Sequence, residues 1–263
     1  MNLGLAGRAA LVGASSKGIG KACAFGFARE GTNVTICARH EDELAQVAQE
    51  IRDETGVEVL AVPTDLTNPD QIKRLVQQHM DRFGRIDVLV TNNGGPPASR
   101  FVNTTTDQWQ LGLDMSLWNV IRLCSEVVPH MQRQHDGRIV NLVSVSAREP
   151  IDGLILSNVA RAGVLGLAKT MANELAHDGI RINNVCPGST LTPRMATLSA
   201  GLAQQRGATP TDVIADWEAN IPLGRMGKPD EIANVVVFLA SDAASFVTGT
   251  TIVVDGGQTR AVF

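Results

Sequence analysis

The stretch Leu11-Val-Gly-Ala-Ser-Ser-Lys-Gly-Ile-Gly20 decides how the chain folds. It follows the apolar run Ala9–Val12 and precedes a helical pattern, with glycines at Gly13, Gly18 and Gly20. Glycines in this place allow a tight turn, close approach of the backbone to a pyrophosphate, and a helix N-terminus aimed at the phosphates. A plain strand-to-helix turn would also use glycine, so the motif predicts a dinucleotide site because of its position between a strand and a helix.

Outward from this turn, short apolar runs alternate with amphipathic stretches along the chain. The runs are rich in Val and Ile and apolar on both faces, as buried parallel strands are. They lie at Ala9–Val12, Val34–Ala38, Val57–Val62, Val88–Thr91, Arg138–Val143, Ile180–Val185 and Thr251–Val254. Helical patterns such as Glu41–Glu54 and Asp65–Arg82 separate them. This alternation predicts an α/β fold, a single Rossmann-type doubly wound parallel sheet of about seven strands with helices on both faces.

No repeat, linker or low-complexity tract interrupts the pattern, so we expect residues 1–263 to form one dinucleotide-binding and catalytic domain. One irregular insert covers about 193–222. An insert of that length in a compact domain is typical of a substrate lid, and a surface helical pair is the alternative. Its apolar side chains suit either a hydrophobic or ring-bearing substrate or packing on the domain. These are Met195, Leu198, Leu202, Ile214 and Trp217.

The composition of the 263 residues is that of a globular protein, with 44% hydrophobic residues, 19% charged residues and a formal net charge of −4. This charge gives no reason to expect nucleic acid or an acidic membrane surface as a partner. No apolar run reaches the roughly 20 residues that span a bilayer, and the N-terminus lacks a secretory signal. The four cysteines are scattered without metal-ligand spacing. We therefore expect a cytoplasmic protein with reduced cysteines, no metal and a small-molecule substrate.

Further motifs follow the glycine turn in a fixed order. They are Thr64-Asp-Leu66, Asn92-Asn-Gly-Gly95, Pro187-Gly188 with Thr192, Gly224 to Ala233, and Asp255-Gly-Gly257. Together with the glycine turn, they resemble the motifs of the short-chain dehydrogenase/reductase family over essentially the whole chain. The resemblance is strongest to its 3-oxoacyl-carrier-protein-reductase-type members. It implies an oxidoreductase that moves a hydride between a nicotinamide cofactor and a carbonyl or alcohol substrate.

The resemblance also implies which residues bind the cofactor. They are Gly13, Ser15, Ser16, Lys17, Gly18, Ile19, Gly20, Arg39, Asp65, Leu66, Asn92, Gly94, Arg161, Pro187, Gly188 and Thr192. The residue that ends the second strand faces the adenosine ribose. The segment Cys37-Ala-Arg-His40 offers no acid to a free 2′-hydroxyl, whereas Arg39 can pair with a 2′-phosphate and Lys17 adds a second cation. We therefore expect NADP(H) as the cofactor, and the alternative is that both cations are solvated surface charges.

At the catalytic positions the chain departs from the family that it resembles. The resemblance implies an Asn, a Ser, a Tyr and a Lys, which map to Ser116, Ser144, Ser157 and Arg161, and the chain contains no tyrosine at all. Ser157 is far less acidic than a phenol, and a guanidinium cannot give up a proton at neutral pH. Ser144 can still bond a substrate carbonyl, and Arg161 can still bind ribose hydroxyls or present its charge to an oxyanion.

Three functions follow from this pattern. In the first, the protein is a reductase, and water held by Ser144, Ser157 and Arg161, or a group of the substrate, supplies the proton. In the second, the fold binds NADP(H) but performs isomerisation, elimination or carbon–carbon bond cleavage, with Glu149 or Asp152 as the base. In the third, the protein is a catalytically silent NADPH-binding regulator. The family resemblance favours the first function, and the chemistry of the site weakens it.

Two long helical stretches, Thr106–Gln134 and Leu154–His177, are apolar over much of their surface. The resemblance implies that these stretches pair between subunits. We therefore expect a homo-oligomer, and specifically a homotetramer.

Overall fold

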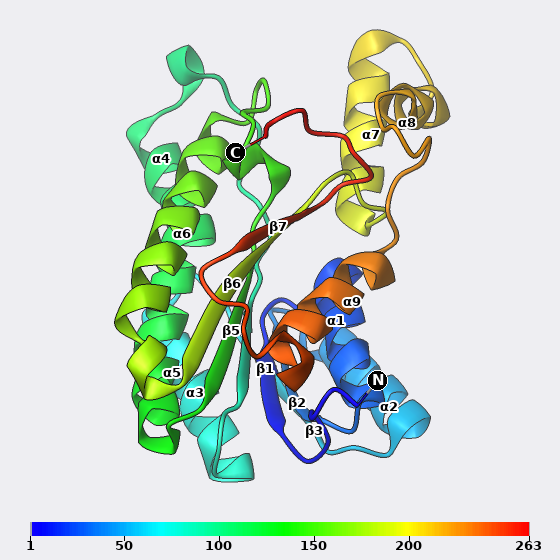
Figure 1. Cartoon of the computed structure of the whole chain (residues 1–263). Helices are drawn as coiled ribbons and strands as arrows, with labels where there is room; N and C mark the ends of the chain where they lie inside the picture. The colour runs from blue at the N-terminus through cyan, green and yellow to red at the C-terminus, as the bar shows by residue number, and fades with distance from the viewer. Residues whose placement is uncertain (1, 263) are drawn as a thin grey trace.

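Seven parallel strands form one sheet at the centre of the molecule (Figure 1). The computed structural model describes residues 2–262, apart from the side chain of Gln205. The strand order is β3-β2-β1-β4-β5-β6-β7, and every pair is parallel. The strands are β1 (Ala9–Val12), β2 (Asn33–Ala38), β3 (Val59–Pro63), β4 (Val88–Thr91), β5 (Gly137–Leu142), β6 (Ile180–Pro187) and β7 (Thr251–Val254). The predicted doubly wound sheet is confirmed.

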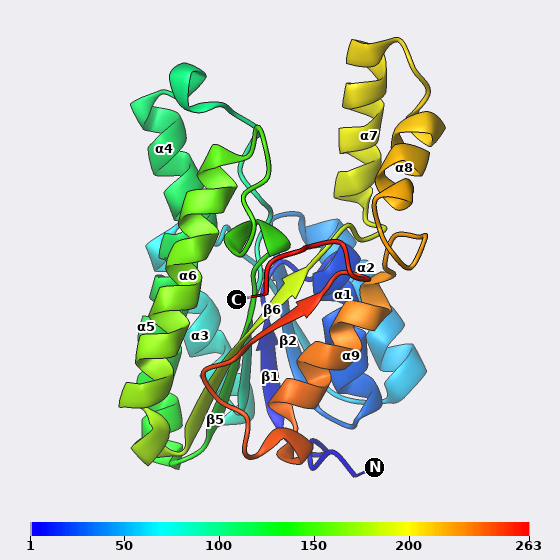
Figure 2. The ribbon, with the colours of Figure 1, turned by 45° about the horizontal axis from the view of Figure 1, so that its top comes forward.

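Helices cover both faces of this sheet, as Figures 1 and 2 show. On one face lie α1 (Gly18–Arg29), α2 (Glu41–Thr55) and α9 (Pro229–Ala240), and on the other lie α3 (Pro69–Phe83), α5 (Asn119–Gln134) and α6 (Ile155–Glu174). Alternate residues of a strand point to opposite faces, so Val88 and Val90 pack in one core while Leu89 packs in the other. Burial on both faces explains why the strands are apolar at successive positions.

The ends of four strands differ from the prediction by one or two residues. For example, β3 begins at Val59 instead of Val57, and β6 continues to Pro187 instead of ending at Val185. The neighbouring strand sets these limits, because Val59 pairs with Val34 of β2 and Pro187 pairs with Val254 of β7. Hydrophobicity alone does not show where pairing stops.

The helical stretch before β5 contains an irregular turn. A short 3-10 turn at Phe101–Asn103 leads to α4 (Thr106–Leu113), which passes through a π-helical turn at Asp114–Trp118 into α5. A π-helical turn inserts an extra residue into the helix and is frequent at functional sites. This turn contains Ser116, which is buried.

The insert after β6 is a helical pair. It consists of α7 (Pro193–Arg206) and α8 (Pro210–Ala219), and Gly207 ends α7 with a positive φ of 65°. The pair stands beyond the carboxyl ends of the strands, opposite α4 (Figure 2). It is therefore placed at the edge of the sheet where the glycine turn and the turns after β4 and β5 lie.

Within residues 2–262, no helix is both long and apolar enough to cross a membrane.

Candidate active site

The candidate site lies where the winding of the sheet changes direction. From β1 the chain proceeds outward through β2 and β3, and it then returns to place β4 on the other side of β1. Such a switch point opens a crevice at the carboxyl ends of the two central strands. The glycine turn leaves β1 here and Asn92 leaves β4, and the side-chain amide of Asn92 donates to the carbonyls of Gly13 and Ala14 at 3.1 and 3.3 Å.

The glycines of the turn are required by close backbone contacts. A Cβ atom on Gly13 would lie 2.6 Å from the carbonyl oxygen of Asn92, and one on Gly20 would lie 2.3 Å from that of Ala14. Gly18 has a positive φ of 58° and begins α1. The turn therefore stays tight, and the free N–H groups at the start of α1, including that of Ile19, are available to an anion in the crevice.

Ser15 stabilises the glycine turn through hydrogen bonds of its side chain. Its side chain is fully buried, and its hydroxyl donates to the carbonyl of Val12 at 2.8 Å and accepts from the N–H of Cys37 at 3.0 Å. These bonds tie the glycine turn to β2. The hydroxyl of Ser15 is thus occupied within the protein, and only the backbone of this residue remains for a ligand.

The cations predicted to meet a 2′-phosphate are both exposed. Lys17 precedes α1 and forms an ion pair with Glu43 of α2 at 3.2 Å. The Lys17 ammonium, with a smaller contribution from the Ser16 hydroxyl, lowers the pKa of the Glu43 carboxyl. Arg39 follows β2 and has no carboxylate within ion-pair distance among residues 2–262. Because exposed pairs contribute little stability, Lys17 can exchange Glu43 for another anion at small cost.

The remaining predicted cofactor residues surround the same crevice. Leu66 is buried and packs against the glycine turn at Gly13, while one carboxylate oxygen of Asp65 accepts from the N–H and hydroxyl of Thr67. Thr192, which precedes α7, packs its methyl group against Gly18. Of three more predicted residues, Gly94 lies in the turn after β4, Pro187 is the last residue of β6 and Gly188 follows it. The sequence therefore predicted a set of residues that the fold brings to one edge of the sheet.

The end of β5 and the start of α6 bring three predicted catalytic residues together. The hydroxyl of Ser144 accepts from the N–H of Ser146 at 3.1 Å, and the Ser146 and Ser157 hydroxyls lie 3.2 Å apart. Nε of Arg161 donates to the hydroxyl of Ser157 at 3.2 Å. The Ser157 side chain is buried and faces the guanidinium and Ser146.

Arg161 is a fixed cation at this edge of the sheet. Its Nη1 donates to the carbonyls of Leu142 and Val143, at the carboxyl end of β5. The pKa of Arg161 is lowered to about 10. Burial is the main cause, and the positive charge of Arg194 is the second. The guanidinium therefore stays charged at neutral pH and can stabilise negative charge that develops beside it.

Comparisons with known proteins agree with this geometry. A family model described as enoyl-(acyl carrier protein) reductase matches residues 13–259. The 3-oxoacyl-[acyl-carrier-protein] reductase FabG of Thermotoga maritima is 37% identical over 256 residues, which cover 96% of this chain and 98% of that protein. The chain belongs to the short-chain dehydrogenase/reductase family.

Solved structures of this oxidoreductase family have the same fold. L-Sorbose reductase from Gluconobacter frateurii, complexed with NADPH and L-sorbose, superposes with a TM-score of 0.96 at 31% identity and full coverage of both chains. A variant of actinorhodin polyketide ketoreductase with NADPH has a TM-score of 0.92 at 30% identity, covering 96% of this chain and 97% of that one. The family resemblance inferred from the motifs is thus confirmed.

Sequence reasoning missed one residue deep in this short-chain dehydrogenase/reductase site, Asn119. Asn119 Oδ1 and Ser116 Oγ are buried and have no hydrogen-bond partner among residues 2–262. The two residues are three apart on one helix face, and they line a small cavity together with Asn92, Asn93 and Arg161. Buried polar atoms are almost always paired, so this cavity suits a bound water molecule. The available signal was a pair of polar residues at helical spacing in an apolar stretch.

Sequence reasoning also missed Arg194, in the first turn of α7. Its Nη1 donates to the carbonyl of Gly95 at 2.7 Å, and its Nη2 donates to that of Pro96 at 3.2 Å. The base of the insert is thereby fastened to the turn that follows β4. Only the folded structure reveals this contact, since 99 positions separate Arg194 from Gly95 in the sequence.

The acidic residues considered as bases lie on the loop after Ser144 and are exposed. Glu149 Oε2 already accepts from the backbone N–H of Arg260 at 2.8 Å, and Asp152 forms no ion pair with a described residue. Among residues 2–262, no group of three or more His, Cys, Asp or Glu side chains gathers in a way that could hold a metal ion.

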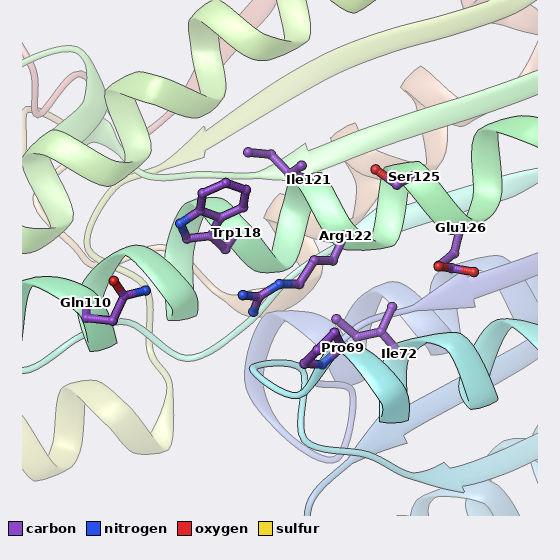
Figure 3. Close-up of a pocket in the computed structure, with 8 residues that line it drawn as sticks. All are labelled: Pro69, Ile72, Gln110, Trp118, Ile121, Arg122, Ser125 and Glu126. Carbon is purple, nitrogen blue, oxygen red and sulfur yellow. The ribbon is translucent and has the colours of Figure 1, made fainter.

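A larger groove of about 530 Å³ lies on the outer helical layer of this protein, between α3 and the continuous helical segment formed by α4 and α5 (Figure 3). Arg122 crosses it, donating to the carbonyl of Thr67 at 2.9 Å, pairing with Asp114 at 2.8 Å and lying over the Trp118 ring. The groove is separate from Ser144 and Arg161. Its main cation is already paired, so we place the chemistry in the crevice and not here.

Proposed function

We propose that this protein is an NADP(H)-dependent oxidoreductase that acts on a carbonyl or alcohol substrate without a tyrosine as the proton donor. The observation that carries the proposal is the arrangement of Ser144, Ser157 and Arg161 at the end of β5, beside the glycine turn. It joins a hydrogen-bond donor for a carbonyl oxygen to a fixed positive charge. In this proposal Ser157 and Arg161 take the positions of the family's Tyr and Lys.

The crevice fits a dinucleotide. The glycine turn leaves no room for a Cβ atom at Gly13 or Gly20, so its backbone can approach a pyrophosphate closely, and α1 begins at the same point. When bound there, NADPH would supply the hydride. Support for the phosphorylated cofactor comes from Lys17 and Arg39, which are exposed at the ends of the turn and of β2. Two structural neighbours were solved with NADPH.

The cofactor preference is tested by titrating the protein with NADPH and with NADH and following nicotinamide fluorescence. We expect tighter binding of NADPH, because two cations can meet the 2′-phosphate. Replacing both by Arg39→Ala and Lys17→Ala should remove most of this preference and leave NADH binding nearly unchanged. Equal or reversed affinities in the unaltered protein would reject the assignment.

In the proposed reduction, Ser144 donates a hydrogen bond to the substrate carbonyl, which becomes an alkoxide when hydride reaches its carbon. Arg161 lies in reach of Ser157 and of the same end of β5, and its charge stabilises the developing oxyanion. Its pKa of about 10 keeps it charged, so it does not supply the proton at neutral pH. A water molecule then delivers the proton. Ser116 and Asn119 offer two unpaired acceptors that can hold such water beside Arg161.

The reaction is tested by single-turnover absorbance of NADPH with a panel of ketones. We expect NADPH oxidation by the unaltered protein and a changed rate in the double variant Ser157→Tyr with Arg161→Lys, which restores the usual residues of the family. Product formation without loss of NADPH would instead indicate non-redox chemistry. Binding of NADPH without any product would indicate a regulator.

We further propose that residues 1–263 act as one unit in which the insert at about 193–222 closes over the substrate. Thr192 packs on the glycine turn at the base of α7, so binding in the crevice and movement of the insert would be coupled. Partial proteolysis tests this coupling. NADPH should slow cleavage within the loop between α7 and α8 more than cleavage at the chain ends.

A further inference from the structure

Two arginines of the candidate site form no ion pair with an acidic residue of the described range 2–262. Arg161 donates to two backbone carbonyls and to Ser157, and Arg194 donates to the carbonyls of Gly95 and Pro96. Within residues 2–262 neither guanidinium lies within ion-pair distance of a carboxylate. Arg161 is half-buried and Arg194 is exposed, and two guanidiniums of like charge without a carboxylate beside them attract an anion.

The two guanidiniums border the same short segment after β4. Arg161 lines a cavity with Asn92 and Asn93. Arg194 donates hydrogen bonds to the carbonyls of Gly95 and Pro96, which lie two and three positions after Asn93. The charge of Arg194 contributes to the lowered pKa of Arg161, and burial lowers the pKa of Arg194 itself. The potential in this part of the crevice is therefore positive.

Two other arginines of the protein are neutralised by acids. Arg138 pairs with Asp136 and Asp242, and Arg8 pairs with the same two acids. Arg181 donates to backbone carbonyls, and burial, followed by the charge of Arg138, lowers its pKa to about 10, although Asp242 and Asp136 act in the opposite direction. Among residues 2–262, Arg161 and Arg194 therefore lack the ion pairs that Arg8 and Arg138 form.

We propose that Arg194 binds a carboxylate of the substrate, so that the substrate of this site is an oxo acid whose reacting carbonyl lies beside Ser144. The inference rests on the proposed reductase function and names its substrate class. A guanidinium carries five N–H donors, and the two bonds to Gly95 and Pro96 leave donors that can form the paired contact that carboxylates favour.

The cofactor's phosphates are the other possible source of an anion, and the structure favours the substrate. The pyrophosphate already has the N–H groups of the glycine turn and of the start of α1. Arg194 instead extends from the insert toward Gly95 and Pro96, in the turn after β4. The guanidinium lies directly on this glycine, since a Cβ atom on residue 95 would lie 2.7 Å from both of its terminal nitrogens.

The test compares 2-oxo and 3-oxo acids with their methyl esters in the full-length protein. In the unaltered protein we expect kcat/KM to favour the acid over its ester. In Arg194→Gln we expect this ratio to fall by about 10- to 100-fold, mainly through KM, as is typical for loss of a hydrogen bond to a charged group. The Kd of NADPH should change less than about threefold. Arg194→Lys should keep part of the preference, because the charge remains.

The matched control is Arg206→Gln, which removes an arginine from the other end of α7, where it pairs with Asp216 at 3.7 Å. This variant should keep both the acid preference and NADPH binding. An unchanged acid-to-ester ratio in Arg194→Gln, together with a much weaker Kd for NADPH, would assign Arg194 to the cofactor phosphates and overturn the proposal. Equal rates for acids and esters in the unaltered protein would overturn it as well.

A binding measurement distinguishes failure of this inference from failure of the proposed reductase function. Oxamate, a non-reducible analogue of a 2-oxo acid, is titrated into the NADPH-saturated protein. If no oxo acid is reduced but oxamate binds and Arg194→Gln abolishes its binding, the carboxylate site stands and the proposed reaction fails. If oxamate and the oxo acids fail to bind at all, the carboxylate site is rejected.

Discussion

The serine at position 157 has a different role from that of an exposed catalytic hydroxyl. It is buried and bonded to Ser146 and Arg161, so it holds the guanidinium in place more directly than it faces the crevice. Arginine also differs from lysine here, because its planar group reaches two carbonyls and a hydroxyl at once. These contacts explain why a serine and an arginine can occupy these two positions together.

The pH dependence of the reduction follows from the same residues. Arg161, with a pKa of about 10, remains charged across the neutral range, and no tyrosine is present to titrate. We expect kcat/KM to be nearly independent of pH between about 6 and 9 and to fall only as the pH approaches that of Arg161 deprotonation. Initial rates in constant-ionic-strength buffers measure this profile. A clear midpoint near neutrality in the unaltered protein would mean that another titrating group donates the proton.

Residue positions along the chain allowed one part of the site to be predicted and not another. Ser144, Ser157 and Arg161 stand at fixed intervals after β5, so a gap-free comparison of motifs was sufficient to place them. Arg194 and Asn119 could not be found in this way. Their importance depends on a loop 99 positions away and on a cavity between elements, and neither leaves a pattern in the local sequence.

At the scale of elements, His79 joins α3 to its neighbours. Its Nε2–H donates to the carbonyl of Arg85 at 3.0 Å, which leaves Nδ1 to accept from the hydroxyl of Thr35 in β2 at 2.7 Å. Burial is the main cause that lowers the pKa of His79 from 6.5 to about 4. The folded protein therefore keeps this ring neutral under conditions in which the unfolded chain protonates it.

This difference makes stability depend on acid. Below pH 6.5 the unfolded chain binds a proton that the folded protein does not, so the contribution of His79 is lost progressively as the pH falls from 6.5 toward 4. We expect the free energy of unfolding to fall by up to about 3 kcal/mol over this range from this group alone. Denaturant unfolding at several pH values measures it. His79→Gln should be less stable at pH 7 and should show a flatter dependence, and an equally steep curve in that variant would contradict the assignment.

The ends of a helix carry local signals that the ends of a strand lack, although the predicted stretch Asp65–Arg82 begins four residues before α3. Asn68 caps α3 by accepting from the N–H groups of Asp70 and Gln71, and Pro69 follows it. Gly84 ends the helix, so residues close in sequence determine both ends of α3. A strand end has no such local signal. It depends on where the neighbouring strand stops, as Pro187 beside Val254 illustrates.

At the scale of the whole molecule, contacts that hold distant segments together were not predictable from the sequence. Arg8 near the N-terminus pairs with Asp136 and Asp242, and Arg138 pairs with the same two acids. The four residues come from the start of the chain, from β5 and its approach, and from the turn after α9. Charged residues are common on any surface, so only the fold reveals which of them meet.

Assembly is the property of the whole molecule that remains a prediction, and its argument rests on the outer surface of α4, α5 and α6. Large apolar side chains are exposed there and in the π-helical turn between α4 and α5, with Leu111 at 46%, Trp118 at 42% and Val159 at 47%. We expect a homotetramer in light scattering at micromolar concentration, because pairing of these helices between subunits would cover those side chains.

Trp118→Glu combined with Val159→Glu should give smaller species without loss of helical signal in circular dichroism. Phe246→Ser, which changes a fully exposed side chain after α9, should leave the mass unchanged. A monomeric mass for the unaltered protein would contradict the prediction, and the apolar helix surface would then need another partner.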